Sequence, residues 1–167
     1  MAKETGKKQQ YGLLVVDAFS KYCQVVPIKS KQVDDVLEGL NELMKLMQAK
    51  PDSRYSDGEG AFVSNKVQYY FRSEGIKHII TRSHTPLAER MIRTNKDMVY
   101  KRVEGLQDPI WTNQIKAVLN YYNNKHVSRA TGFTPSDGKM SNHRKRNSYE
   151  TVNECQEKLE VSAHSCR

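Results

Sequence analysis

The hydrophobic positions of the chain follow two different spacings, which predict two kinds of element. Two short apolar runs, Tyr11 to Val16 and Tyr22 to Ile28, predict a pair of strands, and Ser20-Lys21 between them fits a tight hairpin turn. From about Gln32 to Ala49 the apolar residues instead recur every three or four positions, which predicts an amphipathic helix. Its apolar stripe, which we expect to pack against a sheet, contains Val36, Leu37, Leu40, Leu43, Met44 and Met47.

Short strands and helices alternate through the middle of the chain. A strand from Ser53 to Ser56 is expected to end at Asp57. Ser64 can cap a helix that runs to Glu74, and the residues from Lys77 to Thr81 predict a further strand. Two longer helices are predicted next, and irregular structure is expected from Asn123 to Pro135. The first of these helices runs from Pro86 through Glu104 and ends at Gly105, and the second is opened by Asp108-Pro109.

This order of elements predicts an α/β domain with a mixed sheet and helices packed on its faces. A chain of 167 residues has the size of one domain. We expect a disordered leader at residues 1–10, a folded core at residues 11–138, and a basic tail at residues 139–167, in which Tyr149 to Leu159 can form a short helix. Nothing resembles a signal peptide or a membrane-spanning segment, so we expect a soluble, intracellular protein that binds no membrane.

The charge of the chain points to an anionic partner. Its net charge is +8 and its pI is near 9.4. Basic residues gather just after Glu89 and again from Lys139 to Arg146. The three cysteines are widely separated and form no Cys-x-x-Cys pair, so we expect reduced thiols rather than a zinc site.

Three carboxylates occupy positions where a metal site can form. Asp17 closes the first apolar strand, Asp57 follows the strand from Ser53 to Ser56, and Glu89 lies at the start of a helix. A charge at the end of an apolar strand loses hydration, and a divalent cation shared with two further carboxylates can compensate for that loss. Oxygen ligands of this kind suit two Mg²⁺ ions that catalyse phosphoryl transfer. The alternatives are a turn residue for Asp57 and a helix-dipole contact for Glu89, and we expect Glu59 to point elsewhere.

The sequence around these acids resembles the catalytic core of retroviral-type integrases. The run VVDAFSKY from Val15 to Tyr22 resembles the first-strand motif of that family, and Ser56-Asp57-Gly58 followed by Phe62 resembles its second-aspartate motif. The run AERMIRTNK from Ala88 to Lys96 is similar to the glutamate helix of integrases from Polinton (Maverick) elements. The family's closing pattern is matched by Trp111, Tyr122-Asn123, His126 and the run TGFTP from Thr131 to Pro135.

The resemblance covers roughly residues 11–138 and implies a ribonuclease H-like fold, with a mixed five-stranded sheet flanked by helices. It implies that Asp17, Asp57 and Glu89 hold two Mg²⁺ (or Mn²⁺) ions per active site, with Asp17 bridging them. The implied activity is that of a DNA integrase core, an endonuclease and strand transferase that performs 3′-end processing and strand transfer of element DNA. Because no zinc-binding domain precedes Tyr11, we expect an excised or truncated core.

The implied partners are double-stranded DNA, both element ends and target, and a second copy of the core as a homodimer. The implied location is the nucleus or, in transit, a viral particle or the cytoplasm. Arg93 and Lys96 follow Glu89 by one and two helical turns, so we expect them to hold DNA phosphates, the alternative being a Glu89–Arg93 salt bridge. Two other functions stay open: a catalytically silent domesticated core that binds DNA or protein, and a ribonuclease H that cleaves RNA–DNA hybrids.

Overall fold

The computed structural model describes residues 11–48, 50–81, 86–104, 106, 110–127, 129 and 132–140. These residues fall into two compact units. The first contains the described residues of 11–16 and 23–121, and the second contains those of 17–22 and 122–140. The expected leader at residues 1–10 and the tail beyond residue 140, with its helix from Tyr149 to Leu159, lie outside the described residues.

The first unit begins with the predicted hairpin. Strand β1 (Tyr11–Val16) pairs antiparallel with β2 (Cys23–Ile28), so that Tyr11 lies opposite Ile28 and Val16 lies opposite Cys23. Both strands are confirmed to within one residue. Because alternate side chains of a strand face opposite sides, Val26 and Ile28 of β2 share a buried face.

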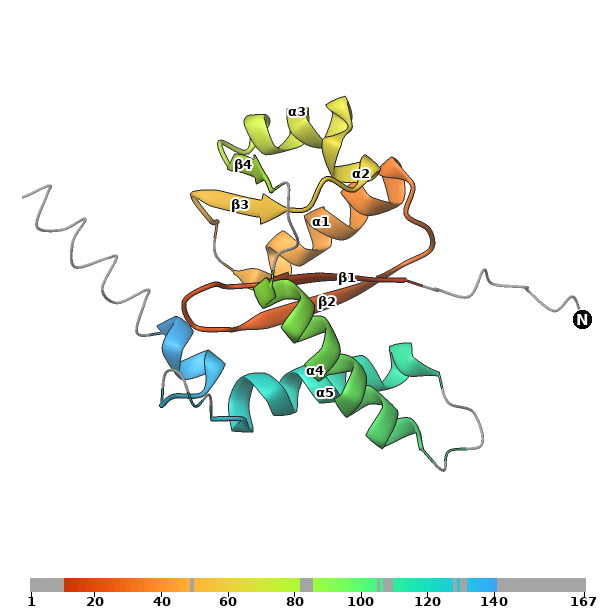
Figure 1. The fold of residues 1–167 in the computed structure, drawn as a ribbon, viewed down its shortest axis with the longest axis vertical. Helices are drawn as coiled ribbons and strands as arrows, with labels where there is room; N and C mark the ends of the chain where they lie inside the picture. The colour runs from red at the N-terminus through yellow and green to blue at the C-terminus, as the bar shows by residue number, and fades with distance from the viewer. Residues whose placement is uncertain are drawn as a thin grey trace, which may run out of the picture. The chain divides into compact units, whose positions relative to one another are not determined.

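Helix α1 (Val33–Met47) packs against this hairpin (Figure 1). The stripe residues Val36, Leu40, Leu43 and Met47 are buried, as the helical spacing predicts. Gly39 permits a close approach, because a Cβ atom there would lie 2.8 Å from Ile28 Cγ2 and 3.1 Å from Leu13 Cδ2. A larger residue at this position would push the helix off the strands.

Two further strands follow in the same unit. Strand β3 (Ser53–Ser56) pairs parallel with β4 (Lys77–Ile80), with Ser53 opposite Lys77 and Ser56 opposite Ile80. They are connected through α2 (Gly60–Val63) and α3 (Asn65–Ser73). Helix α3 begins at the predicted cap, because Ser64 Oγ accepts from Val67 N at 3.4 Å. The four-residue α2 was not predicted, since one helical turn carries no measurable apolar period.

One buried cluster joins these elements, and β2, α1 and α3 contribute most of it. Leu13 and Val15 of β1 pack against it from the hairpin. Its buried members are Val26, Ile28, Val36, Leu40, Leu43, Val67, Phe71 and Ile76. Helix α1 therefore lies between the hairpin and the α3 layer and fixes the distance between them.

The two long helices of the second half are α4 (Pro86–Val103) and α5 (Trp111–Lys125). Helix α4 packs on β1 and buries Met91, Asn95 and Val99. The start of α5 also reaches the hairpin, because a Cβ atom at Gly12 would lie 3.3 Å from Trp111 Cη2. The predicted helix end at Gly105 and helix start at Asp108-Pro109 lie outside the described residues.

The sheet differs from the prediction. The described residues form two separate sheets, β1–β2 and β3–β4, so the mixed five-stranded sheet is not confirmed. The apolar pattern by itself predicts four strands, and all four are present among the described residues. The fifth was implied only by the family resemblance. Strands β3 and β4 have four residues each, so each strand can form only a few ladder hydrogen bonds. The hydrogen bonds along one edge of each strand are used to pair the two strands with each other.

In the second unit, the prediction of irregular structure from Asn123 to Pro135 is confirmed for the described residues between 126 and 134 and is wrong at both ends. Helix α5 continues to Lys125, and residues 135–140 are helical. Thr134 caps this short helix, since its Oγ1 accepts from Asp137 N at 3.2 Å and donates to Asp137 Oδ2 at 2.7 Å. The helix packs on the turn at residues 17–22, where a Cβ atom at Gly138 would lie 3.2 Å from Ser20 Cβ. No described helix is long and apolar enough to cross a membrane.

The core predicts a contrast between two leucines of α1. Leu43 is 0% exposed and Leu46 is 41% exposed. We expect Leu43→Ala to lower the free energy of unfolding by about 2–5 kcal/mol, because it leaves a cavity between the helix and its neighbours. Leu46→Ala, the matched control, should change it by no more than about 0.5 kcal/mol. Urea denaturation measures both, and equal losses would contradict this core.

Candidate functional site

Asp17 organises the hairpin turn in the second unit. Its Oδ2 accepts a hydrogen bond from Ser20 N at 2.8 Å and another from the Ser20 hydroxyl, and Ser20 is buried. The backbone closes the same turn, since Asp17 N donates to Tyr22 O at 2.8 Å and Lys21 N donates to Asp17 O at 2.9 Å. The Asp17 charge is therefore compensated in part by Ser20, a local partner in the same turn.

A cation also lies near Asp17 in this unit. Lys139 Nζ sits 4.2 Å from the centroid of the Tyr22 ring, a cation–π contact. The pKa of Lys139 is lowered overall, because burial lowers it by more than the negative charge of Asp17 raises it. Among the described residues, both hydrogen bonds that reach the carboxylate end on Oδ2, which leaves Oδ1 available to another ligand.

Asp57 follows β3 in the first unit and is exposed. The peptide unit before it is fixed by Thr81, because Ser56 O accepts from Thr81 N at 2.8 Å and from Thr81 Oγ1 at 3.1 Å. The peptide unit after it is fixed by Ser56, whose hydroxyl donates to Asp57 O at 2.9 Å. The backbone at Asp57 is thus held on both sides while its carboxylate faces solvent.

The Ser56 hydroxyl also contacts His78 of β4. His78 Nε2 lies 2.9 Å from Ser56 Oγ, and His78 Nδ1 lies 2.8 Å from Gln68 Nε2 on α3. The His78 ring packs on Phe71, with the ring centroids 4.5 Å apart. Burial lowers the pKa of His78, and the nearby Arg54 guanidinium lowers it further, so the ring is neutral at pH 7.

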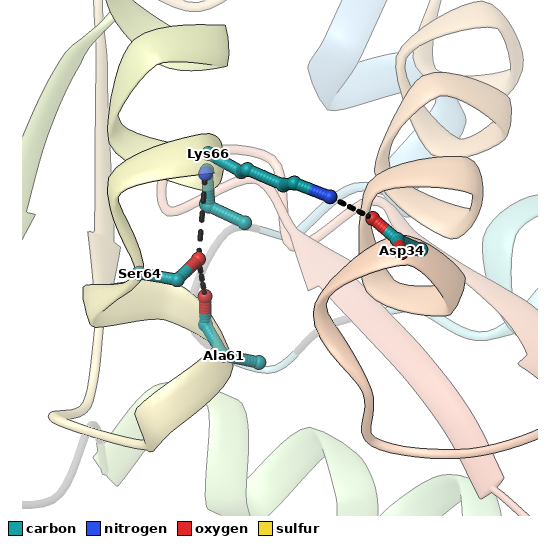
Figure 2. Close-up of polar contacts among 5 residues, drawn as sticks. Asp34, Ala61, Ser64 and Lys66 are labelled. Atoms are coloured by element: carbon teal, nitrogen blue, oxygen red, sulfur yellow. Dashed lines mark hydrogen bonds and ion pairs between the residues drawn. The ribbon is translucent and has the colours of Figure 1, made fainter.

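The segment after Asp57 is tied to the start of α1. Lys66 Nζ reaches Asp34 Oδ1 at 2.9 Å, and the Ser64 hydroxyl donates to Ala61 O at 2.7 Å (Figure 2). Glu59 pairs with Lys31 and raises its pKa, with a smaller contribution from Asp57. Glu59 therefore has its own partner. Both ion pairs are exposed, so each holds the segment only weakly.

Glu89 lies in the first turn of α4 and is exposed. Arg93 and Lys96 lie farther along α4 and are exposed as well. The alternative of a Glu89–Arg93 salt bridge is not observed, since Arg93 makes no ion pair with any residue that the structure describes. The guanidinium of Arg93 is therefore available to an anion.

The three candidate metal ligands are divided between the two units. Asp17 belongs to the second unit, and Asp57 and Glu89 belong to the first. Among the described residues, no three His, Cys, Asp or Glu side chains are grouped so that they could hold a metal ion. The donor chemistry fits Mg²⁺, because all three offer carboxylate oxygens and Asp57 and Glu89 are exposed. Their sharing of a metal stays a prediction.

Comparisons with known proteins relate the fold to that of viral integrases. The HTLV-2 integrase catalytic core domain, solved in complex with magnesium, is similar in its trimeric form (TM-score 0.67, 24% identity, 76% of this chain and 82% of that one) and in its dimeric form (TM-score 0.68, 23% identity, 77% and 83%). A chain of the simian T-cell lymphotropic virus intasome, solved with the PP2A regulatory subunit B56 gamma, has a TM-score of 0.68 at 21% identity over 74% of this chain and 46% of that one.

The curated relatives that match in sequence include a viral polyprotein and a transposon-derived protein. The Gag-Pol polyprotein of Walleye dermal sarcoma virus is 28% identical over 120 residues, which are 68% of this chain and 7% of the polyprotein. An uncharacterised transposon-derived protein of Caenorhabditis elegans is 27% identical over 127 residues, 75% of this chain and 44% of that protein. The chain thus spans less than half the length of either relative, and no family model matches it. Its α/β fold is that of retroviral integrase catalytic cores, which is ribonuclease H-like.

The neutral His78 predicts a pH dependence of stability. Because its pKa is lower in the folded chain than the ordinary value of 6.5, the unfolded chain binds more protons as the pH falls below 6.5. The free energy of unfolding should therefore decrease between about pH 7 and pH 5. Urea denaturation across this range checks it, with His78→Gln as the control that should lose this part of the slope. Identical slopes in both proteins would contradict the assignment.

Proposed function

We propose that the chain is the catalytic core of a DNA integrase, a metal-dependent polynucleotidyl transferase and endonuclease that processes the 3′ ends of element DNA and joins them to target DNA. The observation that carries the proposal is the likeness of its fold to retroviral integrase cores over about three quarters of the chain. Two of the acids that the family resemblance singles out, Asp57 and Glu89, are exposed within the first unit, Asp57 directly after a strand and Glu89 in the first turn of a helix.

Asp17, Asp57 and Glu89 would hold two Mg²⁺ or Mn²⁺ ions. When bound, such ions lower the pKa of the attacking hydroxyl and stabilise the charge on the leaving oxygen of the phosphodiester. The residues of the chain supply oxygen ligands and hold them in place. Ser20 orients the Asp17 carboxylate through Oδ2, and hydrogen bonds to the backbone on either side of Asp57 keep that carboxylate outside the strand.

The proposed nucleic-acid contacts are Arg93 and Lys96 on the exposed side of α4. Both are cations that make no ion pair with a described residue, and they follow Glu89 along the helix. Cations placed beside a catalytic acid can hold the phosphates that flank the scissile bond. The net charge of +8 favours double-stranded DNA as the partner.

Three finer properties are part of the proposal. The similarity of the run from Ala88 to Lys96 favours an element of the Polinton type. Self-association as a homodimer is supported by the dimeric and trimeric forms named for the HTLV-2 core. The nucleus is the proposed location, because the DNA that an integrase joins is found there.

A catalytically silent core that binds DNA or protein is the second candidate. It is favoured by one observation: the Asp17 carboxylate already has Ser20 as a hydrogen-bond partner. The two candidates differ in their response to metal, because a ligand that binds the folded state raises the melting temperature. A working site should gain stability from Mg²⁺ or Mn²⁺, and a silent core should not.

Removing any one carboxylate should abolish strand joining. We expect Asp17→Asn, Asp57→Asn and Glu89→Gln each to lower Mg²⁺-dependent strand transfer or disintegration by more than about 100-fold, since even residues that only orient metal ligands cost 10–100-fold. Glu59→Gln is the matched control, an exposed acid close to Asp57 that should keep its activity. Near-normal activity of any one of the three variants would remove that residue from the site.

The same proteins test the second candidate. In thermal melting, the wild type should be stabilised by Mg²⁺ and the three variants should not. A wild type that shows neither activity nor stabilisation by metal would favour the silent core.

Arg93 and Lys96 should contribute to DNA affinity independently of sequence. We expect Arg93→Ala and Lys96→Ala each to weaken binding to every duplex tested and to lower the log–log salt slope by about one unit per lost phosphate contact. The melting temperature should stay the same, because neither side chain has an ion-pair partner among the described residues. Lys45→Ala on the exposed side of α1 serves as the control. An unchanged slope for both variants would exclude α4 as the contact surface.

A further inference from the structure

The strongest unexplained feature of the molecule is a chain of hydrogen bonds that ends at Asp57. It runs from Gln68 on α3 through His78 on β4 to Ser56 at the end of β3. None of these three residues belongs to the proposed metal site or to the proposed DNA surface. We propose that His78, acting through Ser56, is a positioning residue for Asp57. This inference rests on the proposed function, in which Asp57 is a metal ligand.

In this series of hydrogen bonds, each group donates to the next one on the way from Gln68 to Asp57. Gln68 Nε2 donates to Phe62 O at 2.8 Å and to His78 Nδ1 at 2.8 Å, so Nδ1 acts as an acceptor. The proton of the neutral ring then lies on Nε2, which donates to Ser56 Oγ at 2.9 Å. The Ser56 hydroxyl is left with its own proton to donate, and it donates to Asp57 O at 2.9 Å. Each group therefore orients the next.

The last bond of this chain completes the restraint on the Asp57 backbone. Thr81 fixes the peptide unit that precedes Asp57 through two hydrogen bonds to Ser56 O. The Ser56 hydroxyl fixes the peptide unit that follows it. The Cα atom of Asp57 lies between two fixed planes, so only the side-chain torsions of the carboxylate stay free. Without the Ser56 hydroxyl, the second plane is released toward Gly58, a residue with wide backbone freedom.

The end of this hydrogen-bond series that lies away from Asp57 is anchored in the hydrophobic core. The His78 ring packs on Phe71, which is 2% exposed and belongs to the main buried cluster. Gln68 also donates to Phe62 O of α2, the helix that follows Asp57 in the sequence, and so connects the His78 ring to that helix. The network thus joins β3, β4, α2 and α3 around the segment that carries Asp57. This arrangement holds the backbone at Asp57, a candidate metal ligand on an exposed loop, in a fixed position relative to the core.

A positioning role and a purely structural role predict different measurements. Loss of a residue that orients a metal ligand costs about 10–100-fold in metal affinity or activity. Loss of a residue that only stabilises the strands lowers the melting temperature and leaves the metal requirement of the folded protein unchanged. The Mg²⁺ concentration for half-maximal activity is therefore the readout that separates the two roles.

The experiment measures disintegration activity of the full chain against Mg²⁺ concentration, with the melting temperature of each protein recorded alongside. The variants are Ser56→Ala, which removes the hydroxyl; Ser56→Thr, which keeps it; and His78→Phe, which keeps the contact with Phe71 but loses both ring nitrogens. We expect Ser56→Ala and His78→Phe to need about 10- to 100-fold more Mg²⁺, with activity recovering at saturating metal. Ser56→Thr should behave like the wild type.

An unchanged Mg²⁺ requirement in folded Ser56→Ala or folded His78→Phe would overturn the positioning role, even if the melting temperature falls. If Ser56→Ala does not fold, His78→Phe carries the test alone. Failure of the proposed function is recognised separately, because the wild type itself would then lack metal-dependent activity. An active wild type whose metal requirement ignores both substitutions refutes only the inference about His78.

Discussion

Burial of one face of α1 is the constraint on which the first unit depends. The residues Val36, Leu40 and Leu43 pack between β2 on one side and α3 on the other. Gly39 lets the helix approach Ile28 and Leu13 of the hairpin closely. Burying large aliphatic side chains of this kind contributes about 1.5–3 kcal/mol each, far more than the exposed ion pairs at Lys31 and Lys66. The positions of α3, and through it of β3 and β4, follow from this core.

Hydrogen bonds, rather than burial, then place the acids that the sequence marks as functional. Asp57 is exposed, the backbone on either side of it is held by hydrogen bonds of Ser56 and Thr81, and His78 contacts the Ser56 hydroxyl. Asp17 is oriented by Ser20 in the turn of the second unit. Packing cannot hold a side chain that is exposed, so polar partners have to do so. The fold therefore places fixed polar partners behind each of these two acids.

The sequence predicts the elements well where a period or a cap marks them. The stripe of α1, the Ser64 cap of α3 and the two strands of the hairpin all carry such local signals. The pairing of strands into sheets carries none, and the fifth strand was inferred only from resemblance. The helix at residues 135–140 was missed although Thr134, Pro135 and Asp137 form a capping pattern that could have revealed it. The contact of Ser56 with His78 joins residues far apart in the sequence, so no local pattern could have predicted it.

The candidate acids were found from their flanking motifs, and their roles as metal ligands depend on whether they share cations. A crystal structure of the full chain grown with Mn²⁺, with anomalous scattering recorded at the manganese edge, tests this most directly. We predict two manganese peaks, with Asp17 ligating both ions and Asp57 and Glu89 ligating one each. The absence of manganese at these three carboxylates, with manganese bound elsewhere or not at all, would contradict it.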